Sequence, residues 1–269
     1  MSMESNVVDA YAPREVAARV RDGGITKARL DLVTMFVLAV LAGAFIGLGA
    51  LFFIIVSTDP SGGYGVSRLI GGLAFSLGLI LVVVAGAELF TGNNLISMAW
   101  ASRLISSGQL ARNWIVVYFG NAVGALGTVA LVLTAGVDEY AGGAVGEKAI
   151  AIAESKAGLG IVQAVALGIL CNALVCLAVW LAMAGRSLVD KVIAIVFPIT
   201  AFVAIGFEHS IANMFFLPYG IALQESDDLV GGALSNLGAV TVGNVIGGTM
   251  LVAGVYWLAY LRPGARRFG

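Results

Sequence analysis

The only histidine of the sequence, His209, lies between Glu208 and Ser210 inside a long apolar stretch. A single histidine on an apolar face more often belongs to a core than to a site. At membrane depth the balance changes, because an ionisable side chain is costly there and is usually functional. Imidazole has a reference pKa of about 6.5 and changes charge over ordinary pH. His209 is therefore the first candidate for moving a proton or holding a small polar solute.

Two carboxylates, Glu88 and Glu208, also lie inside apolar stretches. Each could handle protons or substrate, or could cap free backbone N–H groups or pair with a buried cation. We favour the structural role, because the two glutamates occupy repeat-related positions that suit a shared task. Lys156 precedes another apolar stretch and is either an interfacial lysine that extends to water or a residue of the site.

The sequence offers little for metal or covalent chemistry. Cys171 and Cys176 do not form a CxxC pair, and we interpret them as small buried residues. One histidine and two separated cysteines supply neither a metal-ligand cluster nor a nucleophile with its base. We therefore expect no catalytic residue, no metal and no enzymatic activity. The net charge of −1 also argues against a nucleic-acid partner.

Composition places these residues in a membrane protein. Of the 269 residues, 59% are hydrophobic and 12% are charged, whereas soluble domains contain about 25% charged residues. Stretches of about 20 apolar residues or more, enough to cross a bilayer, recur along the chain. We predict six spans, namely Leu32–Val56, Arg68–Ala101, Asn113–Val137, Leu159–Ala184, Val192–Leu223 and Ala239–Leu261. Residues 31–262 would form the six-helix transmembrane domain and residues 263–269 a cytoplasmic tail.

The N-terminal segment and the positive charges indicate orientation. Residues 1–30 contain no apolar run of the kind found in signal peptides, so we interpret them as a cytoplasmic arm with an amphipathic stretch at Pro13–Val20. Of the 15 basic residues, 12 fall before span one, between spans two and three, between spans four and five, or after span six. Because positive residues collect on the cytoplasmic side, both termini should be cytoplasmic.

The second and fifth spans are too long for one membrane helix. A helix of about 34 residues would measure about 51 Å, against a hydrocarbon core of about 30 Å. Both spans also contain polar residues, in a pattern that occurs twice as Gly86, Glu88, Asn93 and as Gly206, Glu208, Asn213. A second pattern, Gly-Asn-x-(Val/Ile)-Gly, starts at Gly120 and at Gly243. We therefore predict two inverted halves of three spans, with breaks inside 86–94 and 206–210.

Such breaks would favour an anion. Interrupted spans at matching positions of an inverted repeat usually mark the substrate site. The N-termini of half-helices carry partial positive charge and free N–H donors. Thr91 and Ser210 are candidate N-caps of the two half-helices. Small residues such as Gly43, Gly120/Gly124 and Gly243/Gly247 are expected at helix contacts.

Three motifs carry a resemblance to the formate/nitrite transporter family. They are GAELFTGN at 86–93, NALVCLAVW at 172–180 and GFEHSIANM at 206–214. The resemblance covers all six spans, and only the termini and the loop after Val137 look individual. Residues 75–79 and 185–188 look like the formate-channel branch of that family. Glu88 and Gly92 look more like the nitrite branch.

The resemblance implies an aquaporin-like protomer in the inner membrane, assembled as a homopentamer with one pore per protomer and no cofactor. Its substrate would be formate, or alternatively nitrite, hydrosulfide or lactate, with protons as possible co-substrates. We expect the pore to involve His209, Thr91, Asn172, Lys156, Glu208 and Asn213. Apolar constrictions are expected at Phe75, Leu79, Leu89, Phe90 and Phe202, and structural breaks at Gly86, Glu88, Asn93 and Gly206.

Two other classes compete with this interpretation. A water or glycerol channel would share the inverted layout, but the paired Asn-Pro-Ala signature is absent, since Asn93 is followed by Asn94 and Asn213 by Met214. A membrane enzyme would need the reactive groups that are missing here. Anion flux into empty proteoliposomes separates a channel from an enzyme.

Overall fold

The computed structural model describes residues 9–59, 62–224 and 229–263. Within them the chain is helical and has no strand. Six helices are long and apolar enough to cross a membrane, which confirms the predicted six-span, all-α fold. They are α2 (Leu32–Ser57), α3 (Gly63–Ala85), α5 (Ser107–Thr134), α7 (Ile161–Ala184), α8 (Leu188–Ile205) and a last helix formed by α10 (Val230–Ile246) with the π-helical segments η4 (Gly247–Gly254) and η5 (Trp257–Leu261). Residues 1–8 of the predicted arm and 264–269 of the predicted tail lie outside the described residues.

Three boundaries in the structure differ from those expected from the sequence. The helix in the N-terminal arm, α1 (Pro13–Ala28), continues past Val20. The segment after the third span is not a loop, because it contains η2 (Val137–Gly143) and α6 (Ala144–Ala157). The sixth span begins at Val230 rather than Ala239, since residues 230–238 are mostly small or apolar and extend the helix.

Polar residues at helix starts fix several of these boundaries. Asp31 accepts a hydrogen bond from the backbone N–H of Thr34 at 3.0 Å and so caps α2. Ser106 and Ser187 form capping boxes at the starts of α5 and α8. The caps satisfy backbone N–H groups that have no partner in the first turn of a helix.

Small residues bring pairs of long helices into close contact. Helix α2 packs against α5 and α3, and α7 packs against α10 and α8. A Cβ added at Gly124 would overlap the carbonyl oxygen of Val40, and one added at Gly247 would overlap that of Ile169. Gly43, Gly120 and Gly243 are equally crowded, so the predicted helix contacts of these glycines are confirmed.

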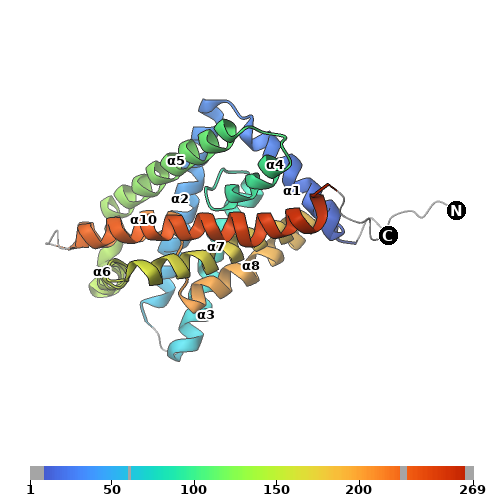
Figure 1. The fold of residues 1–269 in the computed structure, drawn as a ribbon. Helices are drawn as coiled ribbons and strands as arrows, with labels where there is room; N and C mark the ends of the chain where they lie inside the picture. Colours follow the sequence, from blue (N-terminus) through green and yellow to red (C-terminus); the bar gives the residue numbers. More distant parts are fainter. Residues whose placement is uncertain (1–8, 60–61, 225–228, 264–269) are drawn as a thin grey trace.

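The helices place two lysine-bearing elements at opposite ends of the molecule. Helix α1 contacts η5 at the end of the last helix, whereas α6 lies near the start of that helix (Figure 1). Lys27 lies in the last turn of α1 and Lys156 in the last turn of α6.

Two left-handed glycines end the helices that lead into the centre. Gly86 after α3 has φ +85°, and Gly206 after α8 has φ +93°, a region that glycine enters without the steric cost of a Cβ. Residues 86–91 and 206–209 are not helical. The first segment continues into η1 (Gly92–Ile96) and α4 (Ser97–Ala101), and the second into α9 (Ser210–Leu223).

Candidate functional site

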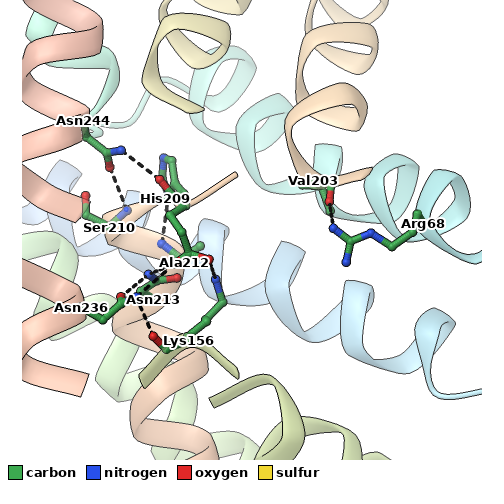
Figure 2. A network of polar contacts seen from close by, with 10 residues as sticks. Arg68, Lys156, Val203, His209, Ser210, Ala212, Asn213, Asn236 and Asn244 are labelled. Carbon is green, nitrogen blue, oxygen red and sulfur yellow. Dashed lines mark hydrogen bonds and ion pairs between the residues drawn. The ribbon is translucent and has the colours of Figure 1, made fainter. Parts of the chain in front are cut away.

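The segment after Gly206 leads into a buried polar cluster. The Nζ of Lys156 lies 2.7 Å from Oε1 of Glu208. The side-chain amide of Asn213 donates to Oε2 of Glu208 at 2.7 Å and to Oδ1 of Asn236 at 2.8 Å (Figure 2). We call Lys156, Glu208, Asn213 and Asn236 the Lys156 cluster. Glu208 is buried, and both of its carboxylate oxygens have partners. It therefore pairs with a cation, which is the structural role favoured from the sequence.

The segment after Gly86 leads into a second cluster with the same pattern. The Nζ of Lys27 lies 2.6 Å from Oε1 of Glu88. The Asn93 amide donates to Oε2 of Glu88 at 2.7 Å and to Oδ1 of Asn113 at 3.0 Å. We call Lys27, Glu88, Asn93 and Asn113 the Lys27 cluster. Each glutamate therefore uses both carboxylate oxygens, one on a lysine and one on an asparagine.

Two asparagines hold the non-helical segments in place. Asn244 accepts from the backbone N–H of Ser210 at 2.8 Å and donates to the carbonyl of Glu208 at 3.0 Å. Asn121 accepts from the backbone N–H of Phe90 at 2.9 Å and donates to the carbonyl of Glu88 at 2.9 Å. These bonds satisfy backbone groups that leave the helices, which hydrocarbon would not tolerate unpaired.

His209 joins the two segments. Its Nδ1 accepts from the backbone N–H of Ala212 at 3.0 Å, so a neutral His209 carries its proton on Nε2. That Nε2 lies 2.9 Å from Oγ1 of Thr91 and can donate to it. The Phe202 ring stacks on the imidazole, with 5.9 Å between centroids.

The predicted caps need correction. His209, not Ser210, is the N-cap of α9. Ser210 already belongs to the helix, and its hydroxyl has no hydrogen-bond partner among the described residues. Thr91 does occupy the N-cap position of η1, but its hydroxyl makes no cap bond and contacts His209 instead.

Asn172 and Cys176 hold the backbone at Thr91. The Asn172 amide lies 3.3 Å from the carbonyl oxygen of Thr91 and 2.7 Å from Oδ1 of Asn94. The Cys176 thiol donates to the same Thr91 carbonyl at 3.4 Å. Cys171 and Cys176 are both buried and free. Cys176 is thus a small buried residue, as expected, with an additional polar contact.

A cavity lies at each of the two clusters, and the one at the Lys156 cluster is lined by His209. The Lys156 cavity, about 320 Å³, is lined by residues that include Arg68, Phe75, Lys156, Phe202, Glu208 and His209. The Lys27 cavity, about 290 Å³, is lined by residues that include Lys27, Leu79, Glu88, Leu89, Gly92 and Asn93.

Apolar side chains line each cavity beside its charged residues. Phe75 and Leu79 lie one turn apart on α3, yet Phe75 lines one cavity and Leu79 the other. Phe75 packs edge-to-face against Phe202, with 5.5 Å between ring centroids. Leu79 and Leu89 are buried on the other side. Phe90 lines neither of these cavities and packs instead against Tyr118.

Most residues of the site were predictable from the sequence, but three of their partners were not. Lys27 was counted only as a basic residue of the arm, although it is the counterpart of Lys156. Asn113 and Asn236 were not singled out, although each completes a cluster. The repeated Glu–x4–Asn spacing was a usable signal, because two equivalent buried carboxylates require two equivalent cations.

Among the described residues, six membrane-length helices and two cavities that each contain a lysine and a glutamate are the layout of a membrane channel or transporter. Comparisons with known proteins specify which kind. The profile of the family described as "Formate/nitrite transporter" matches residues 14–258. The chain belongs to the formate/nitrite transporter family.

Individual relatives cover nearly the whole chain. It is 44% identical to the Formate channel FocA of Escherichia coli (strain K12), over 96% of this chain and 97% of that protein. It is 43% identical to the Uncharacterized transporter YrhG of Bacillus subtilis (strain 168), over 92% and 93%. A solved structure described as "Pentameric formate channel with formate bound" has a TM-score of 0.78 and 41% identity, covering 86% of this chain and 98% of that one. A second, "FNT family ion channel", has a TM-score of 0.82 and 30% identity, covering 93% and 99%.

Proposed function

We propose that this protein is a membrane channel for formate, which crosses between the Lys156 cavity and the Lys27 cavity past His209. Two relatives that match 96% and 90% of the chain are formate channels. The observation that carries the proposal is the His209–Thr91 contact, with a lysine-bearing cavity on each side of it. Nitrite or hydrosulfide remains the alternative substrate, since each is also a small anion of a weak acid.

The same proposal includes an inverted repeat with two broken spans. The Lys27 cluster and the Lys156 cluster use equivalent residues in equivalent bonds. Asn121 and Asn244 likewise bind equivalent backbone groups. A two-fold relation between the halves explains all these pairs at once. In this view α3 with α4, and α8 with α9, are the halves of two interrupted spans.

Charge and desolvation suggest how the anion crosses. A bare anion in an apolar barrier is expensive, because it loses its hydration. The lysine-bearing cavities attract it to either side of the barrier. At the barrier formed by Phe75 and Phe202, His209 takes a proton from the solvent and becomes an imidazolium, in which Nδ1 no longer accepts from Ala212. The imidazolium passes its Nε2 proton to the anion and returns to the neutral form, and the resulting weak acid crosses the Phe75–Phe202 contact as a neutral molecule. Chloride, which does not protonate, lacks this route. Alternatively, a neutral His209 donates a hydrogen bond without transferring its proton, and the flux then carries charge.

We place the protein in the inner membrane as a homopentamer, with both termini in the cytoplasm. The distribution of basic residues supports this orientation, which puts the Lys27 cavity on the cytoplasmic side. A related solved structure is a pentameric formate channel. Exposed apolar side chains such as Val33 and Phe119, on α2 and α5, offer surfaces for lipid or neighbouring subunits.

A flux panel tests the function. Purified protein in liposomes is given formate, nitrite, hydrosulfide, lactate, chloride or glycerol on one side, and uptake is followed with protein-free liposomes as control. We expect formate to enter fastest among the anions and chloride to be excluded. Faster nitrite or hydrosulfide uptake would reassign the substrate. Glycerol uptake without formate uptake would replace the proposal with a neutral-solute channel.

A further inference from the structure

The carbonyl end of helix α8 carries an arginine that has no counterpart in the other half. Arg68, on α3, donates from Nε to the carbonyl of Ala204 at 2.8 Å and from Nη2 to that of Val203 at 2.6 Å. Figure 2 shows its guanidinium directed at Val203 from the neighbouring helix. Both carbonyls belong to the last turn of α8, where helical N–H partners run out. The Val203 carbonyl also accepts from the backbone N–H of Gly206 at 3.1 Å.

This arginine faces the path proposed for the anion. Arg68 is partly buried and lines the Lys156 cavity. A Cβ added at Gly206 would lie 3.0 Å from its Nη2, so the guanidinium sits against the turn that leads to Glu208 and His209. The close approach also explains why a residue without a side chain suits position 206.

The electrostatic effect of Arg68 follows from the helix dipole. The C-terminus of a helix carries about −0.5 of an elementary charge, which would repel an anion entering the cavity. One guanidinium more than cancels it and leaves a positive surface. The N-terminus of α9, which begins at Ser210, then acts on the anion without opposition.

The Lys27 cavity has no arginine equivalent to Arg68 among its lining residues. The equivalent residues Gly86 and Gly206 are 120 residues apart, so the position equivalent to Arg68 is residue 188. Leu188 is exposed. No side chain among the described residues donates to the last carbonyls of α3. Charged residues lining the Lys156 cavity are Arg68, Lys148, Lys156 and Glu208, whereas the Lys27 cavity has Lys27 and Glu88. The formal charges of these lining residues are therefore +2 and 0.

We propose that Arg68 is a specificity-determining residue that makes the Lys156 cavity the higher-affinity side for the anion. The inference rests on the proposed function and deepens it. A passive path has the same permeability in both directions at low formate concentration. A difference in affinity between the two cavities therefore appears as a difference in the half-saturation concentration of the flux. Formate offered from the Lys156 side should saturate the flux at a lower concentration than formate offered from the Lys27 side.

The test uses sealed vesicles of both orientations, distinguished by protease accessibility of a tag fused after Gly269. Initial formate flux is measured against formate concentration at low ionic strength. Arg68→Gln removes the charge but keeps donors for the carbonyls, and should raise the half-saturation concentration from the Lys156 side about three- to tenfold, with little change from the other side. Raised concentrations of an impermeant salt should shrink that difference, because screening shortens to about 3 Å at 1 M.

Two variants separate charge from structure. Arg68→Lys keeps the charge and should stay within about twofold of the wild type. Arg112 also binds helix-end carbonyls, those of Ala28 and Leu30, and lines neither cavity, so Arg112→Gln should leave the Lys156-side value unchanged.

Several results would overturn the inference. One is an unchanged Lys156-side value in Arg68→Gln, and another is an Arg68→Lys variant that behaves like Arg68→Gln. If Arg68→Gln does not assemble, the wild type decides: equal half-saturation from both sides, or equal salt dependence, rejects the role of Arg68. Wild-type vesicles that pass no formate at all would instead reject the proposed function.

Discussion

Replacing Asn244 by leucine should strongly destabilise the protein, because Asn244 holds the non-helical segment that carries His209. The side chain is fully buried. Its loss would leave the N–H of Ser210 and the carbonyl of Glu208 without their partners at 2.8 and 3.0 Å. Its third bond, to the carbonyl of Gly168, matters less, because that carbonyl lies within α7 and retains its helical partner.

The magnitude follows from those two groups. An unsatisfied buried backbone group costs about 1–3 kcal/mol, so Asn244→Leu should cost about 2–6 kcal/mol in free energy of unfolding. At about 2–4 °C per kcal/mol, the melting temperature should fall by at least about 4 °C. Thermal unfolding of the purified protein in detergent measures this shift.

Two variants frame the result. Asn121→Leu removes the equivalent bonds at Phe90 and Glu88 and should cause a comparable loss. Thr134→Val removes one hydrogen bond at the exposed end of α5 and should change stability by no more than about 0.5 kcal/mol. An Asn244→Leu protein that melts within 2 °C of wild type would refute the reasoning, since it would mean that the side chain does not stabilise the segment.

Two further changes should give equally specific results. Gly124→Ala should weaken the α2–α5 contact and lower the melting temperature, because its Cβ would overlap the carbonyl of Val40. Gly127→Ala has open space around its Cβ and should be neutral or slightly stabilising. Equal melting temperatures of the two variants would contradict the close-packing argument. Lys27→Met should raise the half-saturation concentration for formate offered from the Lys27 side in vesicles, because it removes the cation of that cavity, and unchanged flux from that side would show that Lys27 only balances Glu88.

Local sequence patterns were sufficient for the parts of the fold that depend on local physics. Runs of apolar residues predicted the six helices, since length and hydropathy decide which segments can enter a membrane. Glycine followed by a polar run predicted where helices α3 and α8 end, because a left-handed turn favours glycine. His209 was a candidate as a histidine inside an apolar stretch and Thr91 as a candidate cap, whereas Asn172 was named only through the family resemblance. The contacts of all three came only from the structure.

The missed features depend on distant contacts. Lys27 lies 61 residues from Glu88 in the chain, and nothing in the polar segment around it indicates a buried carboxylate partner. Ser210 was the predicted N-cap because serine is the commoner capping residue. In the structure His209 caps α9, because its ring nitrogen accepts from the backbone N–H of Ala212. Arg68 looked like an ordinary basic residue, since only the fold brings it to the end of α8.

The central claim is that formate crosses the barrier beside His209, and paired recording of formate uptake and internal pH tests it most directly. Wild-type and His209→Asn protein are reconstituted into liposomes at equal density, and formate is added with an inward acid step. We expect wild-type liposomes to accumulate formate together with acid. His209→Asn liposomes should lose the acid-dependent part of the uptake, and chloride should enter neither. If His209→Asn liposomes took up formate at the wild-type rate with the wild-type pH profile, His209 would be only the cap of α9, and the proposed path would be wrong.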